Sequence, residues 1–181
     1  DKVELAFIIS GEDEDTVVAV PGDQLKAALD SGEMIRDEAL PADVKVLAYF
    51  NNSDVVDVVP GEDNLATTGI GLQRKAVKTR SSGGTDSAVN IASAYIELID
   101  KDSGEPLGSH LVSQALSDLE TLMPDRPVKD TFDEVKLGDN EYKVGLKYRR
   151  EVKPYWVHLE DVQRRNYSGT DTPRDYSSYI R

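Results

Sequence analysis

The feature that most constrains the fold is a strict two-residue alternation over residues 142–149. Tyr142, Val144, Leu146 and Tyr148 share one parity, while glycine and basic residues occupy the other. Successive side chains of a β-strand point to opposite faces, so this pattern predicts a strand with one buried side. Half-buried strands of this kind are typical of antiparallel sheets.

Similar segments recur along the chain, and turn residues separate them. Stretches rich in β-branched and aromatic residues between Gly, Pro, Asn and Asp predict strands. The expected strands span residues 3–9, 16–20, 44–50, 54–59, 72–80, 88–99, 107–113, 135–137, 142–149 and 155–159. Many strands with few helices predict a mainly β fold, an antiparallel sandwich or open barrel with one or two short helices.

Helical patterns are confined to two short segments. Residues 24–30 are expected to form a helix, with Asp23 as its N-cap and Gly32 just past its end. A second short helix or loop is expected over 116–123, because prolines close that segment. Neither segment is long enough to dominate the fold.

The length of 181 residues suits one domain of ordinary size, so residues 1–181 are predicted as a single domain. Within it, residues 1–65 form an acidic N-terminal part, and residues 72–181 form a β-rich part. Tyr179 and Ile180 have the composition of an opening strand. We therefore interpret the chain as a fragment of a longer protein.

Charge excludes one large class of partner. Lysine and arginine number 21 against 34 acidic residues, which gives a net charge of −13. An acidic protein repels phosphate backbones, so nucleic acid is not an expected partner. The acids concentrate early: residues 1–65 carry sixteen acids and four bases, whereas residues 143–181 carry nine bases and five acids. The C-terminal part therefore presents a different, mildly basic surface.

Motifs of enzymatic chemistry are missing from the sequence. The chain has no cysteine, which excludes thiol catalysis, disulfides and Cys-ligated zinc. No nucleophile elbow, His-Glu-x-x-His pattern or phosphate-binding loop occurs. No catalytic or metal-binding residue is predicted, and the chain is expected not to be an enzyme.

Two histidines remain to be interpreted. His110 lies in a predicted hairpin strand and is expected at the surface. His158 shares a predicted strand face with Trp156, next to Tyr155. A packed histidine, a haem ligand, a proton switch and a partner contact all remain open for His158.

The last 40 or so residues carry a longer motif. A strand of the form Pro-aromatic-x-Val/Leu-x-Leu-x-Asp-Phe is followed by a stretch of the form Tyr-x-Gly-Thr-x-x-Pro-Lys/Arg-x-Tyr/Phe-x-Ser. The matching positions are Pro154, Leu159, Asp161, Tyr167, Gly169, Thr170, Pro173, Arg174, Tyr176 and Ser178. Glycine permits a turn backbone that is closed to other residues, and proline stiffens the approach to the next strand. The segment resembles the ResB family of cytochrome c biogenesis proteins, although Val162 stands where that family has Phe.

This resemblance implies a role in assembly. It implies a domain on the periplasmic, extracytoplasmic side of a bacterial membrane protein that works with a CcsA-type partner and apocytochrome c. Family members of this kind deliver haem and support its attachment, so haem belongs to the complete complex and no cofactor is expected in this chain. The candidate binding residues are Tyr155, Trp156, His158, Arg164, Arg165, Tyr167, Gly169, Thr170, Pro173 and Tyr176.

Two other functions stay open at this point. A secreted or periplasmic β-domain that binds a carbohydrate, a peptide or another protein would also suit an aromatic cluster beside a Gly-Thr turn. A hydrolase is the third reading, because any two acidic residues can meet in the folded chain and form a catalytic pair.

Overall fold

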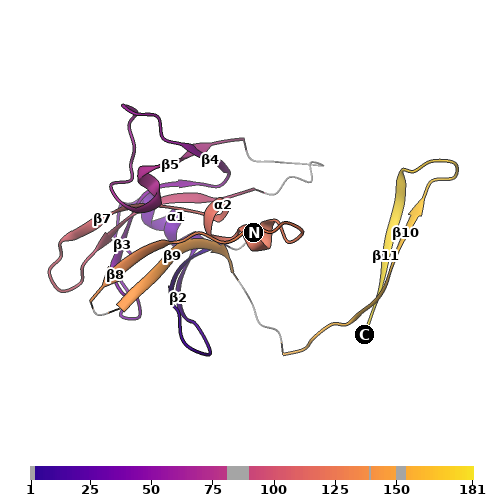
Figure 1. Ribbon diagram of the computed structural model, residues 1–181. Helices are drawn as coiled ribbons and strands as arrows, with labels where there is room; N and C mark the ends of the chain where they lie inside the picture. The colour runs from indigo at the N-terminus through magenta and orange to yellow at the C-terminus, as the bar shows by residue number, and fades with distance from the viewer. Residues whose placement is uncertain (1–2, 81–89, 139, 150–153) are drawn as a thin grey trace. The chain divides into compact units, whose positions relative to one another are not determined.

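A computed structural model describes residues 3–80, 90–138, 140–149 and 154–181 of the chain (Figure 1). It divides into two compact units, Asp1–Arg149 and Arg150–Arg181. The sequence predicts one domain over 1–181. Because the two units are separate bodies, each is described here by itself.

The first unit contains a four-stranded antiparallel sheet in the order β2-β1-β9-β8 (Figure 1). Its strands are β1 (Val3–Ile9), β2 (Thr16–Pro21), β8 (Asp133–Leu137) and β9 (Asn140–Tyr148). The central pair joins the two ends of the unit, since β1 lies directly beside β9. The alternation on β9 acts as predicted, because the apolar residues of the pattern face the core.

A three-stranded antiparallel sheet faces this sheet. Its order is β3-β6-β7, with β3 at Asp43–Phe50, β6 at Ser93–Ile99 and β7 at Pro106–Ser113. The inner faces of the two sheets pack together as one apolar core, as in a β-sandwich. The core side chains from the strands are Leu5, Phe7, Val20, Val44, Val46, Ala94, Ile96, Leu98, Val112, Val135, Leu137, Val144 and Leu146.

A smaller layer covers the other face of the three-stranded sheet. It consists of β4 (Ser53–Asp57) paired with β5 (Arg74–Lys78), and the 3₁₀-helix η1 (Gly69–Leu72) lies between them in the chain. Tyr95 and Leu111 pack against this layer in a second apolar cluster. The Ala76 N–H also donates a 2.9 Å hydrogen bond to the Tyr95 hydroxyl.

Three short α-helices lie among the described residues of the first unit. They are α1 (Gly22–Ser31), α2 (Gln114–Ser117) and α3 (Leu119–Leu122). Helix α1 packs against β3 and β2 and buries Leu25. In the part of the chain that the structure describes, no helix combines the length and the apolar character needed to cross a membrane.

The predicted fold class is confirmed: the chain is mainly β, its sheets are antiparallel, and the arrangement is sandwich-like, with no closed barrel among the described strands. The predicted end of α1 is also confirmed, because Gly32 adopts a left-handed φ of 73° and closes the helix. The predicted N-cap is wrong. Pro21 caps α1 without a side-chain hydrogen bond, because the strand continues to residue 21 and the helix starts at once.

The second unit is one antiparallel hairpin, β10 (Leu159–Asn166) with β11 (Pro173–Ile180). The predicted strand over 155–159 is wrong, because β10 starts only at Leu159. The His158–Arg181 backbone pair (2.8 and 2.9 Å) extends the hairpin by one residue beyond Leu159. Tyr179 and Ile180 end β11, contrary to the prediction that they open a further strand. Of the strand predicted over 88–99, residues 88 and 89 lie outside the described residues.

Candidate functional site

The motif that suggested a family lies in the hairpin unit, and its turn explains several of the motif positions. The Tyr167 N–H donates to the Thr172 carbonyl at 3.1 Å, and the Thr170 N–H donates to the Tyr167 carbonyl at 3.1 Å. Gly169 has a φ of 79°, a left-handed conformation that favours glycine. Arg164 holds the turn from the side, since its Nη2 donates to the Asp171 carbonyl at 2.5 Å. These positions fix the shape of the hairpin.

The register of the hairpin separates its side chains into two unlike faces. Paired residues lie on the same face, and an irregularity between Leu159 and Asp161 places Leu159 and Val162 together. We call one side the apolar face; it carries Leu159, Val162, Tyr176 and Ile180 together with Arg164 and Ser178. We call the other side the polar face; it carries Asp161, Gln163, Arg165, Asp175, Ser177 and Tyr179.

The apolar face has no cover within its own unit. Leu159, Val162, Tyr176 and Ile180 expose 54%, 58%, 66% and 62% of their surface. Two strands alone have no second layer, and an isolated hairpin is at best marginally stable in water. A cluster of exposed apolar side chains marks an interaction surface. The apolar face is therefore the main candidate contact surface of this unit.

The ten predicted binding residues do not form one cluster. Tyr167, Gly169, Thr170 and Pro173 lie at the turn, whereas Tyr155, Trp156 and His158 precede β10 at the other end. The eight residues of β10 separate these groups by roughly 27 Å, at about 3.4 Å per residue. Trp156 and His158 meet edge to face, with ring centroids 6.4 Å apart. Arg164 and Tyr176 share the apolar face, while Arg165 lies on the polar face.

The structure corrects the prediction for His110, which is buried with 3% of its surface exposed. Its register opposite Ile96 places it on the inner face of β7. There, His110 Nδ1 lies 2.8 Å from Asp133 Oδ2, and the other Asp133 oxygen accepts the Ile70 N–H at 2.7 Å. A buried carboxylate partner makes the interior position acceptable for a histidine, which the strand pattern alone did not indicate.

This His110–Asp133 pair connects three elements. His110 comes from β7, Asp133 from β8 at the edge of the facing sheet, and Ile70 from η1. Gly69 approaches so closely that a Cβ there would lie 2.1 Å from Asp133 Oδ2. His110 Nε2 is buried and has no hydrogen-bond partner. The pair links the edges of the two sandwich sheets. Because the two residues lie 23 positions apart, no local sequence pattern indicates this contact.

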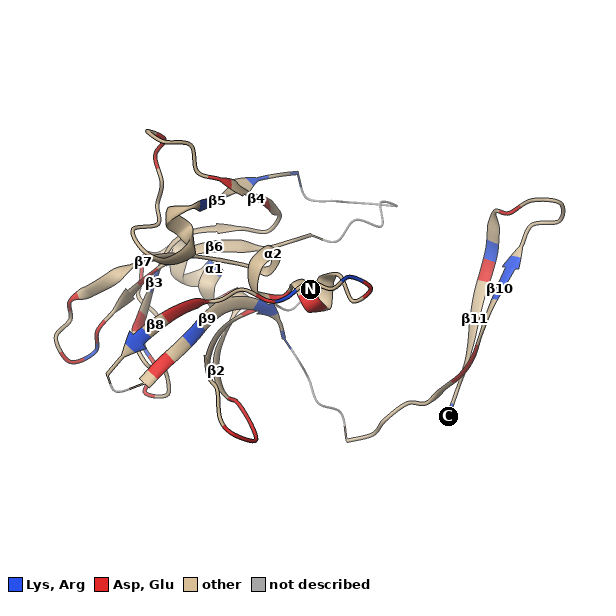
Figure 2. Cartoon of the chain, viewed as in Figure 1, with Lys and Arg blue, Asp and Glu red and all other residues tan. Residues whose placement is uncertain are grey.

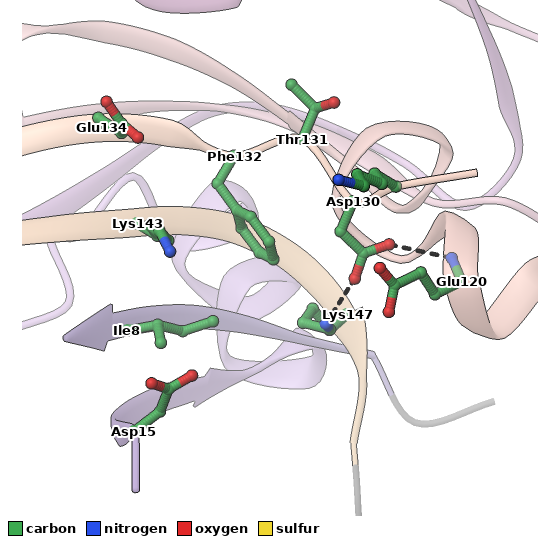
Figure 3. A pocket seen from close by; sticks show the side chains of 10 residues that line it. Ile8, Asp15, Glu120, Asp130, Thr131, Phe132, Glu134, Lys143 and Lys147 are labelled. Atoms are coloured by element: carbon green, nitrogen blue, oxygen red, sulfur yellow. Dashed lines mark hydrogen bonds and ion pairs between the residues drawn. The ribbon is translucent and has the colours of Figure 1, made fainter. Parts of the chain in front are cut away.

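The four-stranded sheet also carries an open pocket of about 460 Å³ on its solvent face (Figure 3). Its lining mixes both signs of charge around an aromatic ring: Ile8, Asp15, Glu120, Lys129, Asp130, Thr131, Phe132, Glu134, Lys143 and Lys147. Lys147 Nζ lies 2.9 Å from Asp130 Oδ2 and 5.2 Å from the centroid of the Phe132 ring. Because this ion pair is largely buried, it acts as a support for the pocket wall.

Acidic side chains continue beyond this pocket onto the loop between β1 and β2, which Figure 2 shows as a red segment. Glu12, Asp13, Glu14 and Asp15 are all exposed there. Within the residues that the structure describes, no three His, Asp or Glu side chains come together as a potential metal site. The pocket and this loop present charged and hydrogen-bonding side chains on one side of the unit.

No protein-family model, curated protein or solved structure matches this chain. The resemblance to the ResB family stays a prediction that rests on the C-terminal motif.

Proposed function

We propose that this chain is a non-catalytic, extracytoplasmic module of a ResB-like factor in a bacterial membrane. It assists haem delivery and c-type cytochrome assembly together with a CcsA-type partner and apocytochrome c. One observation carries the proposal: the motif residues and the apolar face, which its own unit leaves uncovered, coincide on the same hairpin. The module needs no cofactor of its own, because haem is held by the complete complex.

The turn supports this proposal because it gives the motif residues a structural role. Gly169, Thr170 and Tyr167 fix the end of the hairpin, and Arg164 bonds to the backbone of the turn. A fixed turn sets the register of both strands. The register in turn decides that Val162 and Tyr176 share one face. The motif thus stabilises a preformed apolar surface, which lowers the cost of ordering it on binding.

The size of the apolar face suits a partner contact. Full burial of a Leu, Val or Ile side chain contributes about 1.5–3 kcal/mol. Each of these four residues exposes between 54% and 66% of its surface. Covering them would supply on the order of 4–7 kcal/mol, before the costs of association are subtracted. That gain is enough for the face to contribute substantially to assembly.

The proposal is tested by c-type cytochrome maturation in cells that carry the full-length protein. Val162→Asp and Tyr176→Asp place a charge on the apolar face, and Gln163→Asp and Ser177→Asp are matched controls on the polar face. We expect covalent haem staining of cytochromes to be lost with the first pair and kept with the second. Immunoblots of membranes must show equal protein levels. Normal maturation with both apolar-face variants would contradict the proposed function.

A second function, a secreted or periplasmic β-domain that binds a carbohydrate, peptide or protein, is favoured by a different observation. The pocket in Figure 3 places Phe132 among side chains of both charges, which suits a polar ligand with an apolar part. Under this function, maturation would survive all four hairpin variants. Ligand binding would instead depend on Phe132 and would be weakened by Phe132→Ala.

A further inference from the structure

The pocket in Figure 3 is built around an aromatic ring that the sheet holds in place, and we call it the Phe132 pocket. Phe132 comes directly before β8, and its ring packs over Gly145 of β9, since a Cβ on Gly145 would lie 2.8 Å from Phe132 Cδ1. Any larger residue at position 145 would displace the ring. Phe132 is half-buried, so part of the ring stays open to the pocket.

Two of the three lysines that line the Phe132 pocket are engaged by groups of the protein itself. Lys147 Nζ lies 2.9 Å from Asp130 Oδ2, and Lys143 Nζ donates a 3.0 Å hydrogen bond to the Ser10 hydroxyl. Asp130 is held in turn, because its Oδ1 accepts the Glu120 N–H at 3.0 Å. The positive charges of Lys143 and Lys147 are therefore already used.

The carboxylates of the lining are matched less completely. Within the part of the chain that the structure describes, three of them make no hydrogen bond or ion pair: Asp15, Glu120 and Glu134. Glu134 lies directly opposite Lys143 in the register of β8 and β9, yet that lysine bonds to Ser10. Lys129 is the one lysine of the lining without such a partner among the described residues. Three unpaired acids against one unpaired base leave two negative charges, which a cationic ligand would neutralise.

These three carboxylates are spread around the ring and do not form a cluster. Asp15 precedes β2, Glu120 belongs to α3, and Glu134 belongs to β8. Since β2 and β8 are the outer strands of the four-stranded sheet, three strand spacings, or roughly 14 Å, separate them. A metal ion cannot bridge that distance, whereas an extended peptide of about five residues spans it.

The Phe132 ring distinguishes between the two kinds of basic side chain. The protein already places a cation on this ring, because Lys147 Nζ lies 5.2 Å from its centroid. A guanidinium is planar, stacks on aromatic rings, is more weakly hydrated than an ammonium and bonds to a carboxylate through two N–H groups. Arginine therefore suits a pocket that combines a ring with free carboxylates better than lysine does.

We propose that the Phe132 pocket binds a basic segment of an extended peptide, with an arginine side chain over the Phe132 ring. This inference rests on the second function, ligand binding at this pocket, and names the class of the ligand. The volume of about 460 Å³ lies within the range of ligand-binding sites. The exposed acids of the loop between β1 and β2 add long-range attraction for a basic segment at one end of the pocket.

The proposal is tested with the full chain and the blocked peptide acetyl-Gly-Arg-Ala-Arg-Gly-amide, by calorimetry and by ¹H–¹⁵N NMR. We expect saturable binding, with shifts of the backbone amides of Glu120, Phe132 and Lys143. The same peptide with citrulline in place of arginine keeps the shape of both side chains but loses their charge. We expect it to bind at least tenfold more weakly, and the lysine version to bind between the two.

Variants of the chain locate the binding. Glu134→Gln removes one unpaired carboxylate and is expected to weaken the affinity for the arginine peptide about three- to fivefold. Glu38→Gln makes the same charge change on an exposed acid outside the pocket and is expected to leave the affinity unchanged. Phe132→Leu keeps an apolar side chain over Gly145 and is expected to abolish the preference for arginine over lysine. If Phe132→Leu fails to fold, the comparison of Glu134→Gln with Glu38→Gln decides alone.

Four results would overturn the proposal. They are a titration with the arginine peptide that does not saturate, equal affinities for the arginine and citrulline peptides, tighter binding of the lysine peptide than of the arginine peptide, and equal effects of Glu134→Gln and Glu38→Gln. Tighter binding of acetyl-Gly-Glu-Ala-Glu-Gly-amide would also overturn it, while keeping ligand binding at this pocket as a function. Val162→Asp on the hairpin is expected to leave peptide binding unchanged, so this test is separate from that of cytochrome maturation.

Discussion

Replacing Asp133 by alanine is expected to destabilise the first unit severely. Asp133 exposes 5% of its surface, and both of its oxygens are engaged. One lies 2.8 Å from His110 Nδ1, and the other accepts the Ile70 N–H at 2.7 Å. Alanine removes both acceptors at once, so two donors are left buried without partners on β7 and η1.

The magnitude follows from these two contacts. Each buried donor left without a partner costs about 1–3 kcal/mol, so the two together cost about 2–6 kcal/mol. We therefore expect Asp133→Ala to lower the free energy of unfolding by about 3–4 kcal/mol, near the middle of that range. With a urea m-value of about 2 kcal/mol/M, the midpoint falls by roughly 1.5–2 M.

The measurement is urea unfolding of the full chain at neutral pH, followed by far-UV circular dichroism. Circular dichroism is the readout because the chain's one tryptophan, Trp156, belongs to the hairpin unit. Glu134→Ala is the matched control, because Glu134 is the exposed neighbour on β8 and surface changes stay within about 0.5 kcal/mol. A loss below about 1 kcal/mol for Asp133→Ala would refute the reasoning, since it would show that neither donor depends on this carboxylate.

Two further predictions concern turns. Hydrogen bonds from the Ser103 N–H and hydroxyl, and from the Asp102 N–H, hold the pKa of Asp100 below its usual value of 3.8. A lowered folded-state pKa stabilises the fold above the unfolded value and loses that effect as pH falls through the folded value. The difference in urea midpoint between wild type and Asp100→Ala should therefore be complete near neutral pH and shrink below pH 3.8. Gly169→Ala should destabilise the hairpin turn by about 1–2 kcal/mol because of the φ of 79°, which amide exchange over residues 159–180 would detect as lost protection.

Local periodicity located many of the strands because the two-residue repeat is a property of the backbone itself. β1 and β2 begin where the sequence predicts, and the end of α1 at Gly32 follows from a glycine that adopts φ 73°. The pairing of β1 with β9 was not predictable in the same way. It joins residues about 140 positions apart, and only the shared core of the two sheets selects that partner.

The same holds for the candidate site: features set by neighbouring residues were predicted, and contacts between distant residues were not. The glycine and threonine of the turn were identified through the motif that resembles the ResB family, and their role in the turn follows from local turn chemistry. The grouping of Leu159 with Val162 depends on the irregularity between Leu159 and Asp161, which no sequence pattern marks. His110 was misplaced for a related reason, since its partner Asp133 comes from another sheet.

The most direct test of the central claim is photo-crosslinking from the hairpin in membranes of cells that express the full-length protein. A photoreactive phenylalanine analogue is placed at Val162 on the apolar face and, as the control, at Gln163 on the polar face. The proposed function predicts that position 162 crosslinks to the CcsA-type partner or to apocytochrome c, identified by mass spectrometry, and that position 163 does not. Equal crosslinking from both positions, or no crosslink from position 162 to either protein, would contradict it.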